Sequence, residues 1–363
     1  MSLSARAGLT AIVAIVAFVI AHRLYHEPLF AWIPFSTTPY WPPPAAISVP
    51  PPCSQPFTWE EGNCMVRLGD LNFELQVRGK HLPTPLDTSS PSDIPIIFPS
   101  PGWGLDCGLK FAGLESLFPS HTFLCMVVRG NYPSDRPPKE SDMTSTAMAH
   151  DLELLRMYLD LPRLRLYAHS IGGTIALGYA ELYPSHVASL VLVDAKMLDH
   201  DDTPTLMQFV RDRAADPRFS TSIAALKISA NFSDPAFPKN DPEYRHLLLD
   251  LLPWYFSRPE LHLPHYARQV QARPLASNWA LIAHDKANIR DPTPNKALLG
   301  TVIAPTLIIV GEHDAFCTKK VAEIMHAGIR DSELVVYDEC GNLPWVERKE
   351  DFTRKLEEWW SKY

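Results

Sequence analysis

Beyond about residue 60, the chain alternates short apolar runs with longer segments in which apolar positions recur every three or four residues. The apolar runs are 94–98, 122–128, 163–168, 187–195, 305–311 and 333–338. Near-continuous apolar runs of this length are typical of parallel strands that are covered on both faces. The amphipathic helical segments between or after them include 144–161, 171–183, 319–329 and 347–360. This alternation predicts an α/β fold with a mostly parallel, doubly wound sheet.

Two segments depart from that rhythm. Residues 65–79 contain two alternating runs on either side of Gly69-Asp70, which predicts a β-hairpin. Residues 196–300 have no strand pattern and only helical stretches rich in Trp, Tyr and Pro. The simplest interpretation is a helical cap inserted over the sheet, and the alternative is a helical domain without contact to a functional site.

The N-terminal segment has a different character. Residues 7–21 contain one weakly polar residue and no charge, but this run is shorter than the ~18–20 residues that span a bilayer. We expect a membrane anchor formed by a single apolar helix, with a cleaved signal peptide and secretion as the first alternative and a soluble helix as the second. The predicted divisions are an anchor or signal at 1–33, a proline-rich linker at 34–60, a first core part at 61–195, a cap at 196–300 and a second core part at 301–363.

Composition and charge narrow the function classes. The 363 residues are 46% apolar and 20% charged, as in globular proteins. The net charge of −8, without a stripe of Lys and Arg, argues against a nucleic-acid partner. None of the six cysteines has metal-ligand spacing, and neither a metal nor an organic cofactor is implied. Cys53 and Cys64 can pair in an oxidising compartment, whereas Cys125 is expected to be a small buried apolar residue.

The candidate chemistry begins at the turn after the strand at 163–168, where the sequence reads HSIGG. A nucleophilic serine on a sharp strand-to-helix turn requires small residues two positions away, and Ser170 has Ala168 and Gly172 there. The turn places Ser170 at a helix N-terminus, where the Ile171 amide can stabilise an oxyanion. An ordinary serine in a βα turn is the alternative.

In these motifs the chain resembles the α/β-hydrolase superfamily, and most of all its branch of proline iminopeptidase-like enzymes and fungal secondary-metabolite hydrolases. The resemblance extends from residue 66 to the C-terminus. Beside the elbow it rests on RGNYPSDRP at 129–137, PTLIIVGEHDAFC at 305–317 and ECGNLPWVERKEDF at 339–352. It implies that Ser170 is the nucleophile and Asp314 the acid, and that Asn342 stands at the position of the catalytic histidine.

Asn342 puts hydrolysis in doubt, because a carboxamide cannot take the serine proton as an imidazole does. The histidines considered as substitutes are His169, His284, His313 and His326. His169 neighbours Ser170 along the strand, so its side chain is expected to point away, and we do not expect any of the four to replace the missing base.

Two further positions leave alternatives. In IIFPSPGWGLDCG the family's oxyanion loop is altered, so that the second oxyanion donor is the amide of Ser100 or of Trp103, depending on the register. Trp103 can instead be a lid over the pocket. Asp194, at the end of the strand before the predicted cap, is the alternative acid, but GEHD favours Asp314.

These residues favour an enzyme of small-molecule, secondary metabolism that acts as a serine hydrolase on an ester, lactone, thioester or amide, with an impaired triad. Trp254, Tyr255 and Trp279 are candidates for lining a pocket for a small apolar substrate. One alternative is a non-hydrolytic enzyme that cyclises, isomerises or eliminates from a bound polyketide or terpenoid. Another is a membrane-anchored binding protein. A proline-specific peptidase is less expected, because acidic groups that would hold a substrate amine cannot be located.

Overall fold

The computed structural model describes residues 49–86, 93–100, 104–274, 276–293 and 295–363. The predicted N-terminal helix and most of the proline-rich linker lie outside these ranges. Within them, no helix combines the length and the apolar character needed to cross a bilayer.

The centre of the molecule is an eight-stranded sheet with the order β1-β2-β4-β3-β5-β6-β7-β8. The strands are β1 Gly62–Leu68, β2 Leu71–Gly79, β3 Ile96–Pro99, β4 Thr122–Met126, β5 Leu164–His169, β6 Val187–Val193, β7 Thr306–Gly311 and β8 Ser332–Tyr337. Strands β4, β3, β5, β6, β7 and β8 pair in parallel, which confirms the predicted mostly parallel sheet. The predicted hairpin is also present, because β1 and β2 pair antiparallel across the Gly69-Asp70 turn.

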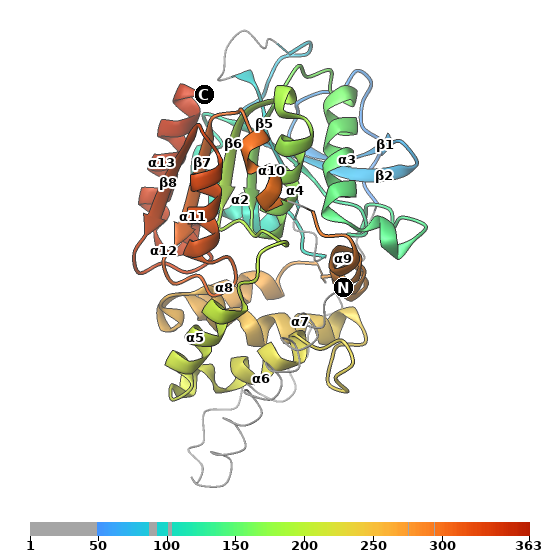
Figure 1. The fold of residues 1–363 in the computed structure, drawn as a ribbon. Coiled ribbons are helices and arrows are strands. Elements are labelled where there is room, and N and C mark those ends of the chain that lie inside the picture. The colour runs from blue at the N-terminus through green and yellow to red at the C-terminus, as the bar shows by residue number, and fades with distance from the viewer. Residues whose placement is uncertain (1–48, 87–92, 101–103, 275, 294) are drawn as a thin grey trace.

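Helices cover both faces of this sheet (Figure 1). They are α2 Gly108–Leu114, α3 Ser145–Tyr158, α4 Ile171–Leu182, α11 Lys319–Gly328, α12 Pro344–Glu347 and α13 Lys349–Lys362. Successive strand residues point to opposite faces. Accordingly, Leu166 and Ala168 pack with residues of α3, α4 and α11, whereas Tyr167 packs with residues of α2 and α13. The apolar runs are continuous because both faces of the central strands are buried.

Further helices lie between β6 and β7 in the chain. They are α5 Thr203–Arg213, α6 Ser220–Ser229, α7 Asp241–Leu251, α8 Pro259–Gln271 and α9 Asn278–Arg290. We call these five the cap helices, and Figure 1 shows α5 to α8 grouped beyond one end of the sheet. The short α10, Asn295–Leu298, contacts α4 in the sheet layer instead. Short 3₁₀ turns are η2 Glu115–Leu117, η3 Glu140–Asp142, η4 Pro184–His186, η5 Pro217–Phe219, η6 Leu252–Tyr255 and η7 Leu299–Thr301.

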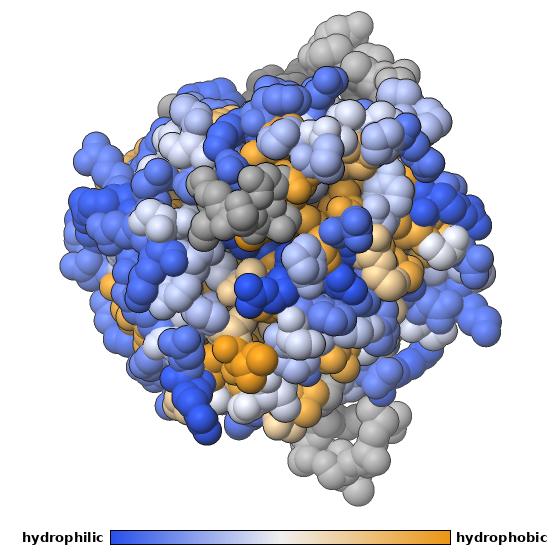
Figure 2. Space-filling model, turned by 90° about the horizontal axis from the view of Figure 1, so that it is seen from above, coloured by the Kyte–Doolittle hydropathy of each residue, from blue (hydrophilic) through white to orange (hydrophobic). Residues whose placement is uncertain are grey.

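Helix α9 is fastened to the start of α3. The Ser145 amide donates to Asn288 Oδ1 at 3.0 Å, and Ser145 Oγ lies 3.1 Å from His284 Nε2. These groups are buried, so the contacts satisfy polar groups at the N-terminal end of α3 that water would otherwise have to satisfy. Helix α9 is therefore held to α3 by buried polar contacts. The face seen in Figure 2 is mostly hydrophilic, with apolar residues between the polar ones.

Two disulfides link described segments, Cys53–Cys64 and Cys107–Cys125. Cys125 is buried, as expected, but the expectation that it is unpaired is wrong. The pairing with Cys107 was not visible in the sequence, because it depends on where the start of α2 packs. This bond fixes the residue before α2 to β4.

Replacing Cys107 and Cys125 together by alanine should lower the free energy of unfolding by about 3 kcal/mol, because an open loop regains chain entropy. The matched control removes Cys53–Cys64. The two sequence separations are 18 and 11 residues, so loop closure alone predicts losses equal within about 0.5 kcal/mol. A clearly larger loss for the first variant in equilibrium denaturation would report the added loss of α2 packing. A loss no larger than that of the control would show that the bond does not hold α2.

Candidate active site

The candidate residues gather at the carboxyl ends of parallel strands. Ser170 directly follows β5, Asp194 follows β6, Asp314 lies in the loop after β7, and Asn342 lies in the loop after β8. Because these strands are adjacent and parallel, their carboxyl ends meet at one edge of the sheet, where ligands bind in open α/β sheets.

Ser170 occupies a strained turn. Its backbone angles are φ 54° and ψ −124°, a conformation that non-glycine residues rarely adopt. Its amide donates to the Val193 carbonyl at 3.1 Å, and its carbonyl accepts from the Gly173 amide at 2.9 Å. A Cβ on Gly173 would lie 2.4 Å from Ala195 Cβ, so the turn requires glycine there. The sharp turn into α4 is thus encoded by the small residues after Ser170.

The amide of Ile171 remains the candidate oxyanion donor. Ile171 is the first residue of α4, so its N–H has no acceptor within the helix. The Ser100 amide, by contrast, donates to the Met126 carbonyl at 2.9 Å and extends the β3–β4 pairing by one residue. It is therefore not free to bind an oxyanion, and Ser100 fails as a donor for this reason. Trp103 lies outside the described residues.

Asp314 and Asn342 form a buried pair. Asn342 Nδ2 donates to Asp314 Oδ2 at 2.7 Å, while Asp314 Oδ1 accepts from the Phe316 and Cys317 amides at 2.8 and 3.0 Å. Neither side chain is exposed. Burial raises the pKa of Asp314 to about 6, against the lowering effect of these hydrogen bonds. The amide thus fills the donor role toward the acid that an imidazole N–H would have.

Asp194, the alternative acid, lies beside Asp314. Burial, and then the charge of Asp314, raise the pKa of Asp194 well above its usual range. Asp194 Oδ1 accepts from the Gly311 amide at 2.8 Å. Two buried carboxyl groups this close do not both ionise, so Asp194 keeps its proton and Asp314 carries the charge.

Among the described residues, the one hydrogen-bonding neighbour of the Ser170 hydroxyl is Cys317 Sγ, at 3.6 Å. No basic group contacts the hydroxyl there. Burial raises the pKa of the Cys317 thiol well above its usual range, so the thiol does not take the proton. Three of the other histidines bond elsewhere: His284 with Ser145, His313 with Ser257 and His326 with Ser332.

His169 does not point away from the site, as was expected, but lines the same cavity as Ser170. Its Nε2 lies 2.9 Å from the Asn342 carbonyl, which can only accept, so Nε2 carries the proton. Burial, and then the charge of Lys110, lower the pKa of His169 well below its usual range. The ring is neutral and is held by this contact.

Ser170 and His169 line one cavity, whose empty space is about 490 Å³ when its open mouth is included. Its lining residues are Leu105, Asp106, Leu109, Lys110, His169, Ser170, Ile171, Tyr255, Tyr266 and Leu343. Of the three predicted pocket residues, Tyr255 is part of this lining. Trp254 is buried within the cap and donates to the Ser222 carbonyl at 3.0 Å, and the ring of Trp279 lies 4.6 Å from the Arg136 guanidinium. These two do not line the cavity.

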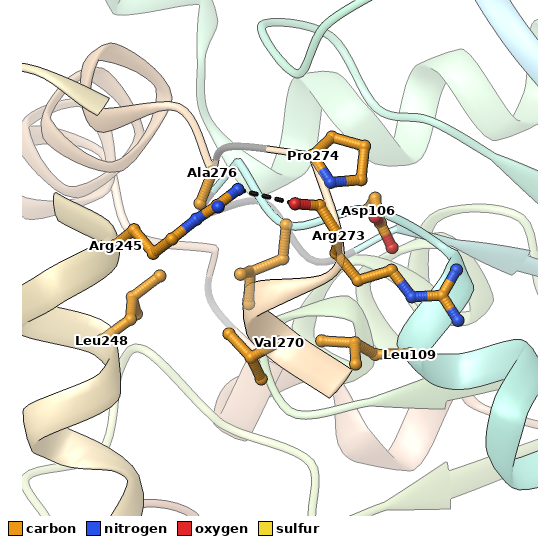
Figure 3. Close-up of a pocket in the computed structure, with 9 residues that line it drawn as sticks. Asp106, Leu109, Arg245, Leu248, Val270, Arg273, Pro274 and Ala276 are labelled. Atoms are coloured by element: carbon orange, nitrogen blue, oxygen red, sulfur yellow. Dashed lines mark hydrogen bonds between the residues drawn. The ribbon is translucent and has the colours of Figure 1, made fainter. Parts of the chain in front are cut away.

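A second hollow of about 290 Å³ adjoins the first and shares Leu105, Asp106 and Leu109 with it. Figure 3 shows Arg245 and Arg273 in this hollow, with Arg245 bonded to the Arg273 carbonyl, a contact of 2.6 Å. Asp106 accepts from the Gly108 amide at 2.6 Å and interacts electrostatically with Arg273. Its carboxylate is therefore already engaged.

Sequence reasoning missed Asp106 and Lys110. The available signal was a lone lysine inside an apolar helical stretch, GLKFAGL, directly after the altered oxyanion loop. In the part of the chain that the structure describes, no group of three or more His, Cys, Asp or Glu side chains is placed to hold a metal ion.

Comparisons with known proteins agree with this architecture. The family model for the alpha/beta hydrolase fold matches residues 100–348. A proline iminopeptidase of Lactobacillus crispatus is 24% identical over 240 residues, which cover 64% of this chain and 76% of the relative. The proline iminopeptidase PfmaB of Pestalotiopsis fici is 23% identical over 271 residues, covering 73% and 92%.

Solved structures show the same fold. An alpha/beta fold family hydrolase from Bacillus anthracis superposes with a TM-score of 0.62 at 18% identity, covering 82% of this chain and 98% of that one. A thermophilic esterase from Thermogutta terrifontis gives 0.58 at 21% identity, covering 82% and 97%.

The carboxyl pair predicts a pH-dependent effect of Asp194→Asn. Above a pH of about 4 the unfolded chain loses the Asp194 proton that the folded chain keeps, so the free energy of unfolding falls by about 1.4 kcal/mol per pH unit from this group. An amide at 194 removes that loss and can still accept from the Gly311 amide. Denaturant titrations should therefore show the variant more stable than the parent by up to about 4 kcal/mol at pH 7, with almost no gain at pH 4.

Asp314→Asn is the matched control. Its carboxylate accepts three N–H groups, which an amide cannot do, so this variant should lose stability by about 1–3 kcal/mol at pH 7. If Asp194→Asn were equally destabilising at both pH values, the assignment of the shared proton to Asp194 would be wrong.

Proposed function

Because the chain belongs to the α/β-hydrolase fold family, we propose that it is an enzyme acting on a small organic ester, lactone, thioester or amide, with Ser170 as nucleophile. The triad of this enzyme is impaired, since Asn342 stands where the base belongs. The observation that carries the proposal is the 2.7 Å contact between Asn342 Nδ2 and Asp314 Oδ2 beside the Ser170 turn.

In this mechanism Ser170 Oγ attacks the substrate carbonyl, and the Ile171 amide donates a hydrogen bond to the carbonyl oxygen as it becomes negatively charged. The Asn342 side chain has no basic atom to take the proton of the Ser170 hydroxyl. That proton must therefore pass to water or to the leaving group. Loss of the histidine costs on the order of 10⁶ in turnover in a related triad, and binding with oxyanion stabilisation leaves about 10³–10⁴ over the reaction in water. A slow hydrolase is the expected outcome.

The same observation favours a second candidate. A pocket that keeps its nucleophile turn and its acid but lacks a base is suited to binding a polyketide or terpenoid and promoting cyclisation, elimination or isomerisation. Holding reacting groups in position supplies several kcal/mol without a triad. Under this candidate the chain belongs to secondary metabolism, and Ser170 contacts the substrate without forming a covalent bond. If the pocket binds such a molecule without converting it, the chain is a membrane-anchored binding protein and not an enzyme.

We do not extend the peptidase activity of the named relatives to this chain. Asp106 is the acidic residue in the lining of both hollows, and it is engaged by the Gly108 amide and Arg273. It is thus poorly placed to hold a free substrate amine.

The two disulfides support a catalytic body that faces an oxidising compartment, either anchored by the N-terminal segment or secreted after its cleavage. In a reducing compartment these bonds would be open.

Labelling of the full-length protein with a fluorophosphonate probe tests the proposal. We expect slow labelling of the parent, none for Ser170→Ala, and a rate at least ~10²-fold higher for Asn342→His, because an imidazole at 342 supplies the missing base. Asn342→Gln, a carboxamide without a basic nitrogen, is the matched control and should not gain. Labelling that appears only with Asn342→His would favour the non-hydrolytic candidate. Labelling that persists in Ser170→Ala would refute the assignment of the nucleophile.

A further inference from the structure

Lys110 is a buried cation without a carboxylate partner among the described residues. It is the third residue of α2, it lines the cavity beside Ser170, and its exposed fraction is 8%. Its ammonium nitrogen contacts His169 Nδ1 and lies 4.5 Å from the centre of the Trp345 ring. Buried lysines without an opposite charge are rare, because removing the charge from water is costly.

The position of Lys110 is built into the packing of α2. A Cβ on Gly113, one turn further along α2, would lie 2.5 Å from the Trp345 ring, so only glycine allows the helix to approach this closely. The Cys107–Cys125 bond fixes the residue before the helix to β4. Lys110 is therefore held in the cavity wall from both ends of α2 and cannot swing freely into solvent.

The neighbour of Lys110 does not neutralise it. His169 carries its proton on Nε2, facing the Asn342 carbonyl, so Nδ1 accepts a hydrogen bond from the lysine. A neutral imidazole and an aromatic ring stabilise an ammonium group, but neither carries a negative charge. One hydrogen-bonding contact with His169 leaves the other N–H groups of Lys110 for a ligand.

Basic residues outnumber acidic ones around the two hollows. Among the described lining residues, Lys110, Arg245 and Arg273 stand against one carboxylate, that of Asp106. The chain as a whole has a net charge of −8, so this local excess of positive charge runs against the overall balance. A cleft lined by one sign of charge concentrates ligands of the opposite sign.

We propose that the cavity binds an apolar molecule that carries one carboxylate, and that Lys110 forms the ion pair with it. The apolar body lies against the remaining lining residues, Leu105, Leu109, Tyr255, Tyr266 and Leu343. This proposal specifies the ligand class of the proposed function. It rests on the proposed function in one respect, namely that this cavity is the substrate site. His169 contacts Lys110 and directly precedes Ser170, so the carboxylate lies close to the bond that Ser170 would attack.

Binding of the anion should depend on pH. Burial lowers the pKa of Lys110 to about 7, and Asp194 and then Cys317 oppose this only to the extent that they are ionised. A bound carboxylate favours the charged amine, so affinity is highest below about pH 7 and falls as the pH rises above it. The other titratable groups that face Lys110 or line its cavity are His169 from β5, Asp194 from the end of β6, Cys317 from the loop after β7, Asp106 from the loop before α2, Tyr255 from η6 and Tyr266 from α8.

Most of these groups keep one protonation state around pH 7. Burial raises the pKa of Tyr255 and Tyr266 and keeps both phenols neutral. Asp194 and the Cys317 thiol stay protonated for the same reason, and His169 stays neutral. Lys110 and Asp106, whose pKa burial also raises, are the groups left to give the affinity its slope, and Lys110→Met separates the two.

Calorimetric titration of the full-length protein with 2-naphthoate and with 2-acetonaphthone tests the proposal, because the ketone has a similar shape but no charge and no bond to hydrolyse. At pH 6 we expect the carboxylate to bind at least about tenfold more tightly, and this preference to shrink at pH 8.5. Lys110→Met should abolish the preference while changing the ketone affinity less than about threefold, which shows that the pocket is still folded. Lys286→Met removes an exposed lysine of α9 as the matched control and should keep the preference.

Equal binding of the two compounds by the parent, or no binding of either, overturns the proposal. So does a carboxylate preference that survives Lys110→Met. Tighter binding of 2-naphthylmethylammonium than of 2-naphthoate would also reject it, in favour of an amine ligand. A failure of Ser170 labelling alone leaves the ion pair standing, so the two proposals fail in different measurements.

Discussion

The Asp314 carboxylate is closed off from water, and the polar groups around it are arranged to satisfy it. It accepts two backbone N–H groups from its own loop and one from the Asn342 side chain. A charged carboxylate in such a place is stable only if its lone pairs are used and no second charge of the same sign is near. This explains why the neighbouring Asp194 keeps its proton, and why residue 342 must be a hydrogen-bond donor whether or not it is a base.

The same carboxylate anchors a line of contacts that reaches the cavity wall. Asn342, held by Asp314, presents its carbonyl to His169, which fixes the tautomer of the ring. The ring in turn accepts from Lys110. Each contact in this line helps to position the next residue. The loop after β8 therefore positions Asn342 directly and Lys110 through His169.

The elements with local signals were predictable from the sequence. The central strands read as apolar runs because two clusters bury their opposite faces, and the Ser170 turn read as an elbow because small residues must follow it. The Ser100 amide could not be assigned, since its use depends on how far the pairing of β3 with β4 extends. Lys110 was invisible for a related reason: its partners His169 and Trp345 come from distant parts of the chain and share no periodic pattern with it.

The position of Asn342 separates two roles that a catalytic histidine combines. One is structural, the donation of a hydrogen bond to the buried acid, and a carboxamide performs it at the observed 2.7 Å. The other is chemical, the transfer of a proton, and a carboxamide cannot perform it. His169 Nε2 lies 2.9 Å from the backbone carbonyl of residue 342, and the Asn342 side chain also acts on the ring, because both groups raise the pKa of His169 against the effect of burial. The proposed ion pair of Lys110 and the proposed acyl transfer at Ser170 therefore share residue 342, and a change of that side chain acts on both the acid and the ring that contacts Lys110.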